Sequence, residues 1–213
     1  MTRTDFPNLT IIKHPLIQTK LTMLRDANTD NYLFRSLLNE IASLMVYEIF
    51  RDFDTVEIEV TTPLEKTIGY RLAKEITLVP ILRAGLGMIG GIQNLIPRSR
   101  VGHIGLYRDK NSLEAVEYYT KLPPNITDNK VILIDPMLAT GGSTSNALTL
   151  IKSTGVTDIR FVCLVAAPEG IKRITADHPE VPIFTAALDR ELNDHAYILP
   201  GLGDAGDRIY GTE

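Results

Sequence analysis

Cysteine is nearly absent from this sequence, and long apolar runs are absent altogether. The one cysteine, Cys163, cannot form an internal disulfide bond, and such sparse use of cysteine fits a reducing compartment. No window reaches the roughly 18 apolar residues of a membrane-spanning helix, and the first ten residues lack the apolar centre of a signal peptide. We therefore expect a soluble, cytoplasmic protein.

Clustered positive charge is also absent. The 213 residues carry 22 Lys and Arg against 26 Asp and Glu, which gives a net charge of -4. A general nucleic-acid binder needs a basic face, so this balance argues against that class of protein. It leaves room for an anionic small substrate, because a few arginines can hold phosphates. The composition of 44% hydrophobic and 23% charged residues is that of a globular chain and excludes disorder as its main state.

The first third of the chain has two patterns. Residues 1–16 read as an extended arm, because Pro7 and Pro15 prevent a long helix. Residues 17–52 read as helical, with a capping cluster at Asn28–Asp30. An apolar stripe at helical spacing, assigned to the core or to a subunit contact, consists of Leu33, Phe34, Leu37, Leu38, Ile41, Leu44 and Met45. The alternating segment Thr55–Val60 then reads as a half-exposed strand.

From residue 76 onward, short apolar runs alternate with segments of helical length. Such runs are typical of parallel strands that are buried on both faces. The predicted strands are Ile76–Leu82, Val101–Tyr107, Val131–Asp135 and Ile159–Ala166. The predicted helices are Leu86–Leu95, Ser143–Ser153 and Glu169–Ala176. The alternation predicts an α/β fold with a mainly parallel, twisted sheet flanked by helices.

The predicted organisation is one domain over residues 1–213. Residues 1–52 form an N-terminal helical arm, and residues 53–213 form the α/β core. The extra strand-like segment Glu114–Leu122 follows the polar stretch Arg108–Ser112 and predicts a small hairpin or hood. In such sheets, ligands bind beyond the carboxyl ends of the strands.

The first strand end with unusual chemistry lies in the segment VILIDPMLATGGSTSNALTLI, residues 131–151. A buried strand ends in Asp135, and Thr140-Gly141-Gly142-Ser143 then opens a helix. Glycines allow a close approach of the backbone to a ligand, and the first N–H groups of a helix form an anion cradle. Asp135 is placed to accept hydrogen bonds from sugar hydroxyls. The segment predicts phosphate and ribose recognition, and it lacks the lysine of a triphosphatase loop. A plain strand–turn–helix connection is the structural alternative.

The second strand end spells G-x-G-x-x-G over Gly85–Gly90, with Asp109 near the acidic position of a dinucleotide fingerprint. A dinucleotide-binding enzyme is thus the rival hypothesis. Three features disfavour it: the fingerprint lies far into the chain, Arg83 precedes it, and Pro97 keeps its helix short.

The third strand end, YILPGLGDAGDRIYG at residues 197–211, holds four glycines and two aspartates within residues 201–211. This composition predicts a segment without ordinary secondary structure, and a disordered tail is the alternative. The flanking apolar residues Tyr197, Ile198, Leu199, Ile209 and Tyr210 favour a loop that is held in place. A rigid glycine loop presents a fixed array of backbone groups, which suits a flat base with polar edges.

Together these segments resemble the uracil phosphoribosyltransferase family, within the type I phosphoribosyltransferases that use 5-phosphoribosyl diphosphate (PRPP). The resemblance is carried by LVPILRAGLGM, VGHIGLYRD, VEYYTKLP, DPMLATGGS, RFVCLVAAPEGI, TAALD and PGLGDAGDRIYGT, and it runs from about His14 to the C-terminus. Most type I enzymes have two acids at the strand end, whereas Pro136 in the second position is the form of this family. The sequence departs mildly at Thr19 and Gly90.

The resemblance implies transfer of the 5-phosphoribosyl group of PRPP to uracil, giving UMP and diphosphate in pyrimidine salvage. It implies catalytic roles for Asp135, Arg108 and Asp204. The implied PRPP-binding residues are Arg83, Arg108, Asp135, Pro136, Met137, Leu138, Ala139, Thr140, Gly141, Gly142, Ser143 and Asp204. The implied uracil-binding residues are Ile198, Gly203, Asp204 and Ala205. Mg²⁺ is implied as a partner of PRPP, GTP as a candidate effector, and a homodimer or larger homo-oligomer as the assembly.

Two alternatives stay open. Another nucleobase is the nearer one, and a nucleotide-sensing regulator that binds RNA or DNA on the same fold is the other. The acidic balance disfavours the regulator. No His or Cys cluster has metal-ligand spacing, so a metal ion is expected to arrive with the substrate. Cys163 is assigned to the core, and His14, His103, His178 and His195 receive no catalytic role.

Overall fold

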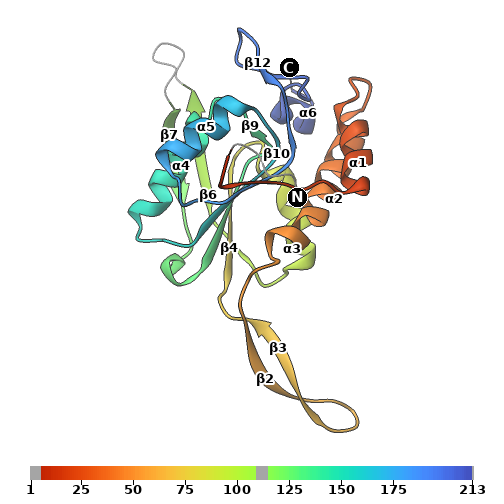
Figure 1. The fold of residues 1–213 in the computed structure, drawn as a ribbon, viewed down its shortest axis with the longest axis vertical. Helices are drawn as coiled ribbons and strands as arrows, with labels where there is room; N and C mark the ends of the chain where they lie inside the picture. The colour runs from red at the N-terminus through yellow and green to blue at the C-terminus, as the bar shows by residue number, and fades with distance from the viewer. Residues whose placement is uncertain (1–5, 109–114, 213) are drawn as a thin grey trace.

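The computed structural model describes residues 6–108 and 115–212, and a twisted, mainly parallel sheet runs through its centre (Figure 1). Across the sheet the strand order is β1 (Leu9–Ile11), β11 (Ile183–Leu188), β10 (Ile159–Ala166), β8 (Lys130–Ile134), β4 (Ile76–Leu82), β6 (His103–Arg108) and β7 (Ala115–Lys121). Two short strands extend it: β5 (Arg100–Val101) pairs with β4, and β9 (Met137–Leu138) pairs with β10. Within the described part of this central sheet, only the β6–β7 pairing is antiparallel.

Helices cover both faces of the sheet. On one face lie α1 (Pro15–Arg25), α2 (Asn31–Ile49) and α3 (Leu86–Leu95), and on the other lie α4 (Gly142–Ser153) and α5 (Pro168–Asp177) (Figure 1). The strands alternate between the two cores: Ile132 and Ile134 of β8 pack in the cluster of α1 to α3, while Val131 and Leu133 pack with α4 and α5. The predicted α/β fold is confirmed, and burial on both faces explains the continuous apolar runs.

The helix α2 holds the predicted stripe, and it begins where the capping cluster predicts. The Asp30 carboxylate accepts a hydrogen bond from the Leu33 backbone N–H at 2.8 Å, which satisfies one of the unpaired donors of the first turn. Most of the stripe is buried as core, including Phe34, Leu38 and Met45, while Leu33 itself is 37% exposed.

Gly85 of the G-x-G-x-x-G segment, and Gly91 directly after the segment, serve close packing. A Cβ atom on Gly91 would lie 2.1 Å from the Asn39 backbone oxygen of α2, and one on Gly85 would lie 2.5 Å from the Ile134 oxygen of β8. Ser43 of α2 also donates to the Gly91 oxygen at 2.7 Å. These close approaches require glycine. They account for the motif without a dinucleotide.

A two-stranded hairpin projects from the body of the molecule (Figure 1). Its strands are β2 (Thr55–Thr61) and β3 (Lys66–Leu72), and they pair antiparallel in a sheet of their own. The predicted strand over Thr55–Val60 is confirmed, whereas the sequence pattern does not predict its partner β3. Leu64 at the turn is 95% exposed.

Three further segments differ from the sequence predictions. The run Val101–Tyr107 is split at Gly102 into β5 and β6, and the expected extended arm supplies the edge strand β1. The prediction that residues 201–211 lack regular structure is wrong, because they contain the short helix α6 (Ala205–Tyr210). Asp204 caps α6 by accepting from the Asp207 N–H, and Gly211 ends it in the left-handed region at φ +66°.

The remaining elements are the 3₁₀ turn η1 (Ile126–Asp128) and the strands β12 (Glu191–Leu192) and β13 (Ile198–Leu199), which pair with each other. Within residues 6–108 and 115–212, no helix is both long enough and apolar enough to cross a membrane.

Candidate active site

The three unusual segments meet at the carboxyl edge of the parallel strands. β4, β8 and β10 run in the same direction as neighbours, so Arg83 after β4 and Asp135 after β8 emerge at one edge of the sheet. The C-terminal segment reaches the same edge, because the Tyr210 hydroxyl donates to the Arg83 backbone oxygen at 3.1 Å. The predicted convergence of these strand ends is therefore present in the fold.

Asp135 lies where the ladder between β8 and β10 is interrupted. Its N–H donates to the Val162 oxygen at 3.1 Å, and the Pro136 oxygen then accepts from both Leu164 at 3.0 Å and Val165 at 3.1 Å. Pairing resumes beyond this point as β9. Proline has no N–H to donate, so Pro136 suits a position where the ladder is broken.

Burial raises the pKa of the Asp135 carboxyl to about 7. A long hydrogen bond of 3.5 Å from the Met137 N–H to Oδ1 opposes this effect, and the negative charge of Asp204 adds to it. Asp135 and Asp204 are thus close enough to interact although they are far apart in the sequence. Two carboxylates that face one ligand form a centre for a cation or for a sugar that develops positive charge.

The cradle at the start of α4 is open. Gly141 has a φ of +80°, and among the described residues no side chain caps this helix end by a hydrogen bond. The first N–H groups of α4 and the positive end of its dipole are therefore available for an anion. A Cβ atom on Gly142 would meet its nearest neighbour, Nη1 of Arg173, at 3.5 Å. Arg173 of α5 thus adds a cation beside the cradle, which the sequence patterns do not predict.

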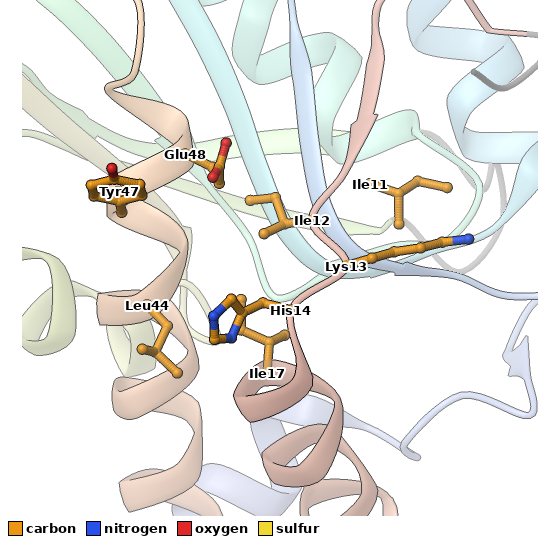
Figure 2. A pocket seen from close by; sticks show the side chains of 8 residues that line it. All are labelled: Ile11, Ile12, Lys13, His14, Ile17, Leu44, Tyr47 and Glu48. Atoms are coloured by element: carbon orange, nitrogen blue, oxygen red, sulfur yellow. The ribbon is translucent and has the colours of Figure 1, made fainter. Parts of the chain in front are cut away.

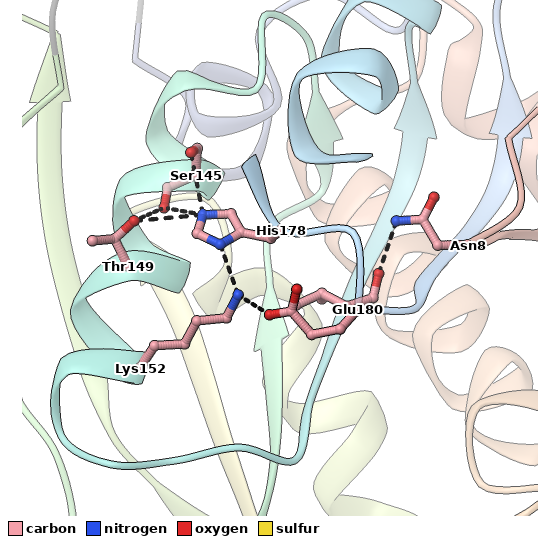
Figure 3. A network of polar contacts seen from close by, with 7 residues as sticks. Asn8, Ser145, Thr149, Lys152, His178 and Glu180 are labelled. Atoms are coloured by element: carbon pink, nitrogen blue, oxygen red, sulfur yellow. Dashed lines mark hydrogen bonds and ion pairs between the residues drawn. The ribbon is translucent and has the colours of Figure 1, made fainter. Parts of the chain in front are cut away.

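Polar contacts fix α4 to the segment after α5 (Figure 3). The Ser145 hydroxyl donates to the Asp177 carboxylate at 2.7 Å. Lys152 has only donors to offer, so Nδ1 of His178 accepts from it at 2.7 Å and Nε2 donates to the Ser145 backbone oxygen at 3.0 Å. Lys152 also pairs with Glu180. Through these contacts His178 holds the cradle helix in place.

The loop at residues 198–205, which the sequence predicts to read the base, is anchored by buried side chains. Ile198, Leu202 and Ala205 are buried, while Gly203 and Asp204 between them are exposed. Gly203 has a φ of +79°, which favours glycine. The apolar side chains thus anchor the loop, and its exposed part presents backbone groups.

Of the two arginines predicted to bind diphosphate, the structure describes the side chain of Arg83 but not that of Arg108. The Arg83 side chain is 60% exposed, lies 3.9 Å from the Asp207 carboxylate, and is 5.6 Å from the centre of the Tyr210 ring. Arg108 is the last residue of β6, but its side chain and the predicted hood at 109–112 lie outside the described residues. Cys163 is buried in β10, as predicted.

A separate cavity of about 280 Å³ lies between the start of α1 and the last turns of α2 (Figure 2). Its lining residues are Ile11, Ile12, Lys13, His14, Ile17, Leu44, Tyr47 and Glu48. Arg160 near the first residue of β10 donates to the Ile49 oxygen at 2.6 Å, so this end of α2 lies at the amino edge of that strand. The cavity is therefore remote from Asp135 and belongs to a different part of the molecule.

The fold places this chain among known proteins of solved structure. A protein from Aquifex aeolicus is 40% identical with a TM-score of 0.91, covering 95% of this chain and 97% of its own. A hypoxanthine phosphoribosyltransferase from Staphylococcus aureus has a TM-score of 0.52 at 15% identity, with coverage of 83% and 82%, which is a likeness of fold alone. The mainly parallel sheet with its strand-end cradle is thus the fold that this phosphoribosyltransferase also has.

Sequence comparison then identifies the family. The model of the family "Uracil phosphoribosyltransferase" matches residues 11–212. The uracil phosphoribosyltransferase of Acholeplasma laidlawii is 55% identical over 205 residues, and that of Dictyoglomus turgidum is 54% identical over 204. These alignments cover 96% and 95% of this chain and 99% of each relative. The chain belongs to the uracil phosphoribosyltransferase family.

The raised pKa of the part-buried Asp135 predicts a specific dependence of stability on pH. Its folded-state pKa of about 7 lies above the ordinary value of 3.8, so the folded chain keeps a proton that the unfolded chain has lost between these pH values. Stability should fall as the pH rises from about 4 to 7, by at most about 4 kcal/mol. Asp135→Asn should remove this slope and unfold at a higher temperature than the parent at pH 8.

Thermal unfolding of the ligand-free protein from pH 5 to 8 measures the effect. The exposed Asp194 supplies the control, since Asp194→Asn should unfold like the parent at each pH. An Asp135→Asn variant that keeps the slope would show that another group titrates.

Proposed function

We propose that this chain transfers the 5-phosphoribosyl group of PRPP to uracil and releases UMP and diphosphate. The observation that carries the proposal is the open cradle of α4, a few residues after the part-buried Asp135 carboxylate that interacts with Asp204. Membership of the uracil phosphoribosyltransferase family supports the choice of uracil and of pyrimidine salvage.

Each part of the site has a task in binding PRPP. The backbone of Ala139–Ser143 receives the 5-phosphate at the N-terminus of α4, and Pro136, Met137 and Leu138 shape the approach to it. Asp135 accepts hydrogen bonds from the ribose hydroxyls. Arg83, and Arg108 at the end of β6, meet the diphosphate.

The reaction breaks the bond from ribose C1 to the diphosphate oxygen and forms a bond from C1 to uracil N1, which loses its proton. Positive charge develops on the ribose as negative charge develops on the leaving group. Asp135 stabilises the former, and the arginines stabilise the latter, so catalysis is chiefly electrostatic. Asp204 lies close enough to Asp135 for their charges to interact and contributes to the same stabilisation.

Mg²⁺ is proposed as a companion of PRPP. The described residues contain no group of three or more His, Cys, Asp or Glu that could hold a metal ion. Mg²⁺ keeps several waters and takes one or two carboxylates together with phosphate oxygens. The Asp204 carboxylate and the phosphate oxygens of PRPP would supply donors of this kind. Asp204 is the residue proposed to hold it, and the ion neutralises the charge of the diphosphate.

Uracil is read by backbone groups of the loop at Ile198, Gly203, Asp204 and Ala205. Uracil offers an acceptor, a donor and an acceptor along O2, N3–H and O4. Cytosine replaces O4 with a donor and lacks the N3 proton, so two groups of the loop would lose their partners. Each unpaired buried group costs about 1–3 kcal/mol, which gives a discrimination of roughly 10²–10⁴.

Product formation from PRPP tests this function directly. With uracil, cytosine, thymine, hypoxanthine and adenine in parallel, we expect UMP from uracil and at least about a hundredfold lower kcat/KM for cytosine. A preference for another base would replace uracil as the substrate. The regulator alternative is tested by RNA binding at low salt with and without UMP, and we expect no specific RNA binding.

Gly142 tests the phosphate cradle. A Cβ at this position meets no atom closer than 3.5 Å, so Gly142→Ala should fold normally and place a methyl group where phosphate lies against the backbone. We expect PRPP affinity to fall by about tenfold or more, measured by isothermal titration. The unfolding temperature without ligand should stay close to that of the parent. Unchanged PRPP binding would place the phosphate elsewhere.

We also propose a homodimer in which a second copy covers the β2–β3 hairpin. A lone two-stranded hairpin is at best marginally stable in water, and this one carries apolar side chains on both faces. Val56, Ile58 and Val60 alternate along β2, while Ile68 and Tyr70 are 55% and 66% exposed on β3. The hairpin thus has more apolar surface than its own chain covers.

The double variant Ile58→Glu/Ile68→Glu places one charge on each face of the hairpin and should shift the dimer toward monomer. Sedimentation at micromolar concentration measures the change. Leu64→Glu, at the exposed turn, is the control: it adds a charge at the tip of the hairpin and should leave the dimer unchanged if the two faces make the contact. If the double variant sediments like the parent, or if the parent is an active monomer, the hairpin is not the contact.

A cytoplasmic location and GTP as an effector also stay proposals. The charge and cysteine pattern of the sequence supports the location. The effector is supported by the resemblance to the family.

A further inference from the structure

Two arginines connect the base-reading loop to the N-terminal helices, and neither belongs to the predicted site. Arg25 is the last residue of α1, and Arg208 lies in α6. Each arginine donates to a backbone oxygen of the loop and also to a group outside it. For Arg25 that group is the Asp189 carboxylate, and for Arg208 it is the end of α1.

Arg25 and Asp189 together hold the peptide groups of Gly201. The Arg25 guanidinium makes two hydrogen bonds to the Asp189 carboxylate, at 2.7 and 2.8 Å, and a third to the Gly201 oxygen at 2.6 Å. Asp189 Oδ2 accepts from the Gly201 N–H at 2.9 Å. The Asp189 side chain is only 6% exposed, so this paired charge is worth more than a surface ion pair. Gly201 also needs its glycine, since a Cβ would lie 2.1 Å from the Ile198 oxygen.

Arg208 holds the opposite side of the loop. It donates to the Leu202 oxygen at 2.9 Å and to the Leu24 oxygen at 2.8 Å, and its other nitrogen donates to the Asp26 oxygen at 2.6 Å. Its guanidinium lies 4.4 Å from the centre of the Phe34 ring of α2. The oxygens at 24 and 26 lie at the C-terminus of α1, where carbonyls lack helical partners and a cation is favoured. One side chain therefore satisfies the end of α1 and the loop together.

These contacts occupy some backbone groups of the loop and leave its exposed residues to face a ligand. Gly201 and Leu202 are occupied by the arginines and Asp189, whereas Gly203 and Asp204 are exposed next to them. Recognition through backbone groups depends on the loop shape, because a backbone N–H or oxygen cannot change its rotamer to follow a shifted base. A displacement of about 1 Å is enough to lose such a hydrogen bond.

We propose that Arg25 and Arg208 are positioning residues for base selection, and that α1 and the start of α2 are thereby part of the base-reading site. The proposal rests on the proposed role of residues 198–205 in binding uracil. Neither arginine touches the base. They set the shape of the loop that does, and the PRPP cradle at α4 depends on other contacts.

Arg160 provides a matched control for the loss of an arginine. It pairs with the Asp52 carboxylate at 2.7 and 3.0 Å, donates to the Ile49 oxygen, and lies 4.3 Å from the centre of the Phe53 ring. Its chemistry thus resembles that of Arg25 and Arg208 taken together. Its place is at the start of β10, away from the loop.

The experiment compares Arg208→Ala, Arg208→Lys and Arg160→Ala in the full chain. For Arg208→Ala we expect the KM for uracil to rise by about tenfold or more and the preference for uracil over cytosine to shrink. PRPP affinity should fall by a clearly smaller factor, because only Asp204 of the PRPP site belongs to this loop while the cradle at α4 is held by other contacts. Arg208→Lys keeps a cation and should recover part of the loss. Arg160→Ala should lower the unfolding temperature without changing either substrate constant.

Three results would overturn the proposal: equal losses for uracil and PRPP in Arg208→Ala, the same rise in uracil KM in Arg160→Ala, or unchanged base preference in folded Arg208 variants. If Arg208→Ala does not fold, Arg208→Lys and Arg25→Lys give the same comparison with charge retained. Failure of the proposed function is distinguishable, because the parent enzyme itself would then form no UMP from uracil and PRPP.

Discussion

The break in the ladder between β8 and β10 is the constraint on which the candidate active site depends. A buried parallel strand cannot leave its backbone groups unpaired, and yet the site needs a carboxylate that leaves the ladder. Pro136 meets both demands: it has no N–H to be satisfied, and its oxygen accepts from both Leu164 and Val165. Pairing resumes at β9, which fixes the path of the chain into Gly141 and α4. The distance between carboxylate and cradle is thus set by the sheet.

Contacts outside the candidate site hold its shape, whereas the Asp135 carboxyl and the N-terminus of α4 within it lack stabilising side-chain partners among the described residues. Among the described residues, the part-buried Asp135 carboxyl forms no ion pair with a cation, and the N-terminus of α4 has no side-chain cap. Compensation comes from outside the site, through Ser145 and His178 behind the cradle and through Arg25 and Arg208 behind the loop. A bound substrate that supplies cation and anion would satisfy the groups left open. The preorganisation required for electrostatic catalysis is therefore visible without any ligand.

The sequence predicts the helices and strands whose formation depends on residues close together along the chain. The strands β4 and β10 and the helix α3 have the predicted bounds, because burial on both faces leaves an unbroken apolar run and Pro97 marks where the helix stops. The hairpin strand β3 has no clear pattern, since Gly69 and charged residues interrupt its alternation. The helix α6 is not predicted because a six-residue, glycine-containing helix depends on Asp204 and on contacts of Arg208 with residues more than 170 positions away. For the same reason the roles of Arg25, Asp189 and Arg173 have no local signal.

The reach of Arg208 across more than 180 positions has a consequence for biosynthesis. Its partners at residues 24 and 26 are synthesised long before Arg208 itself. The end of α1 therefore lacks these hydrogen bonds until the C-terminal segment has been made. The proposed positioning of the base-reading loop can therefore occur only once nearly the whole chain has been synthesised.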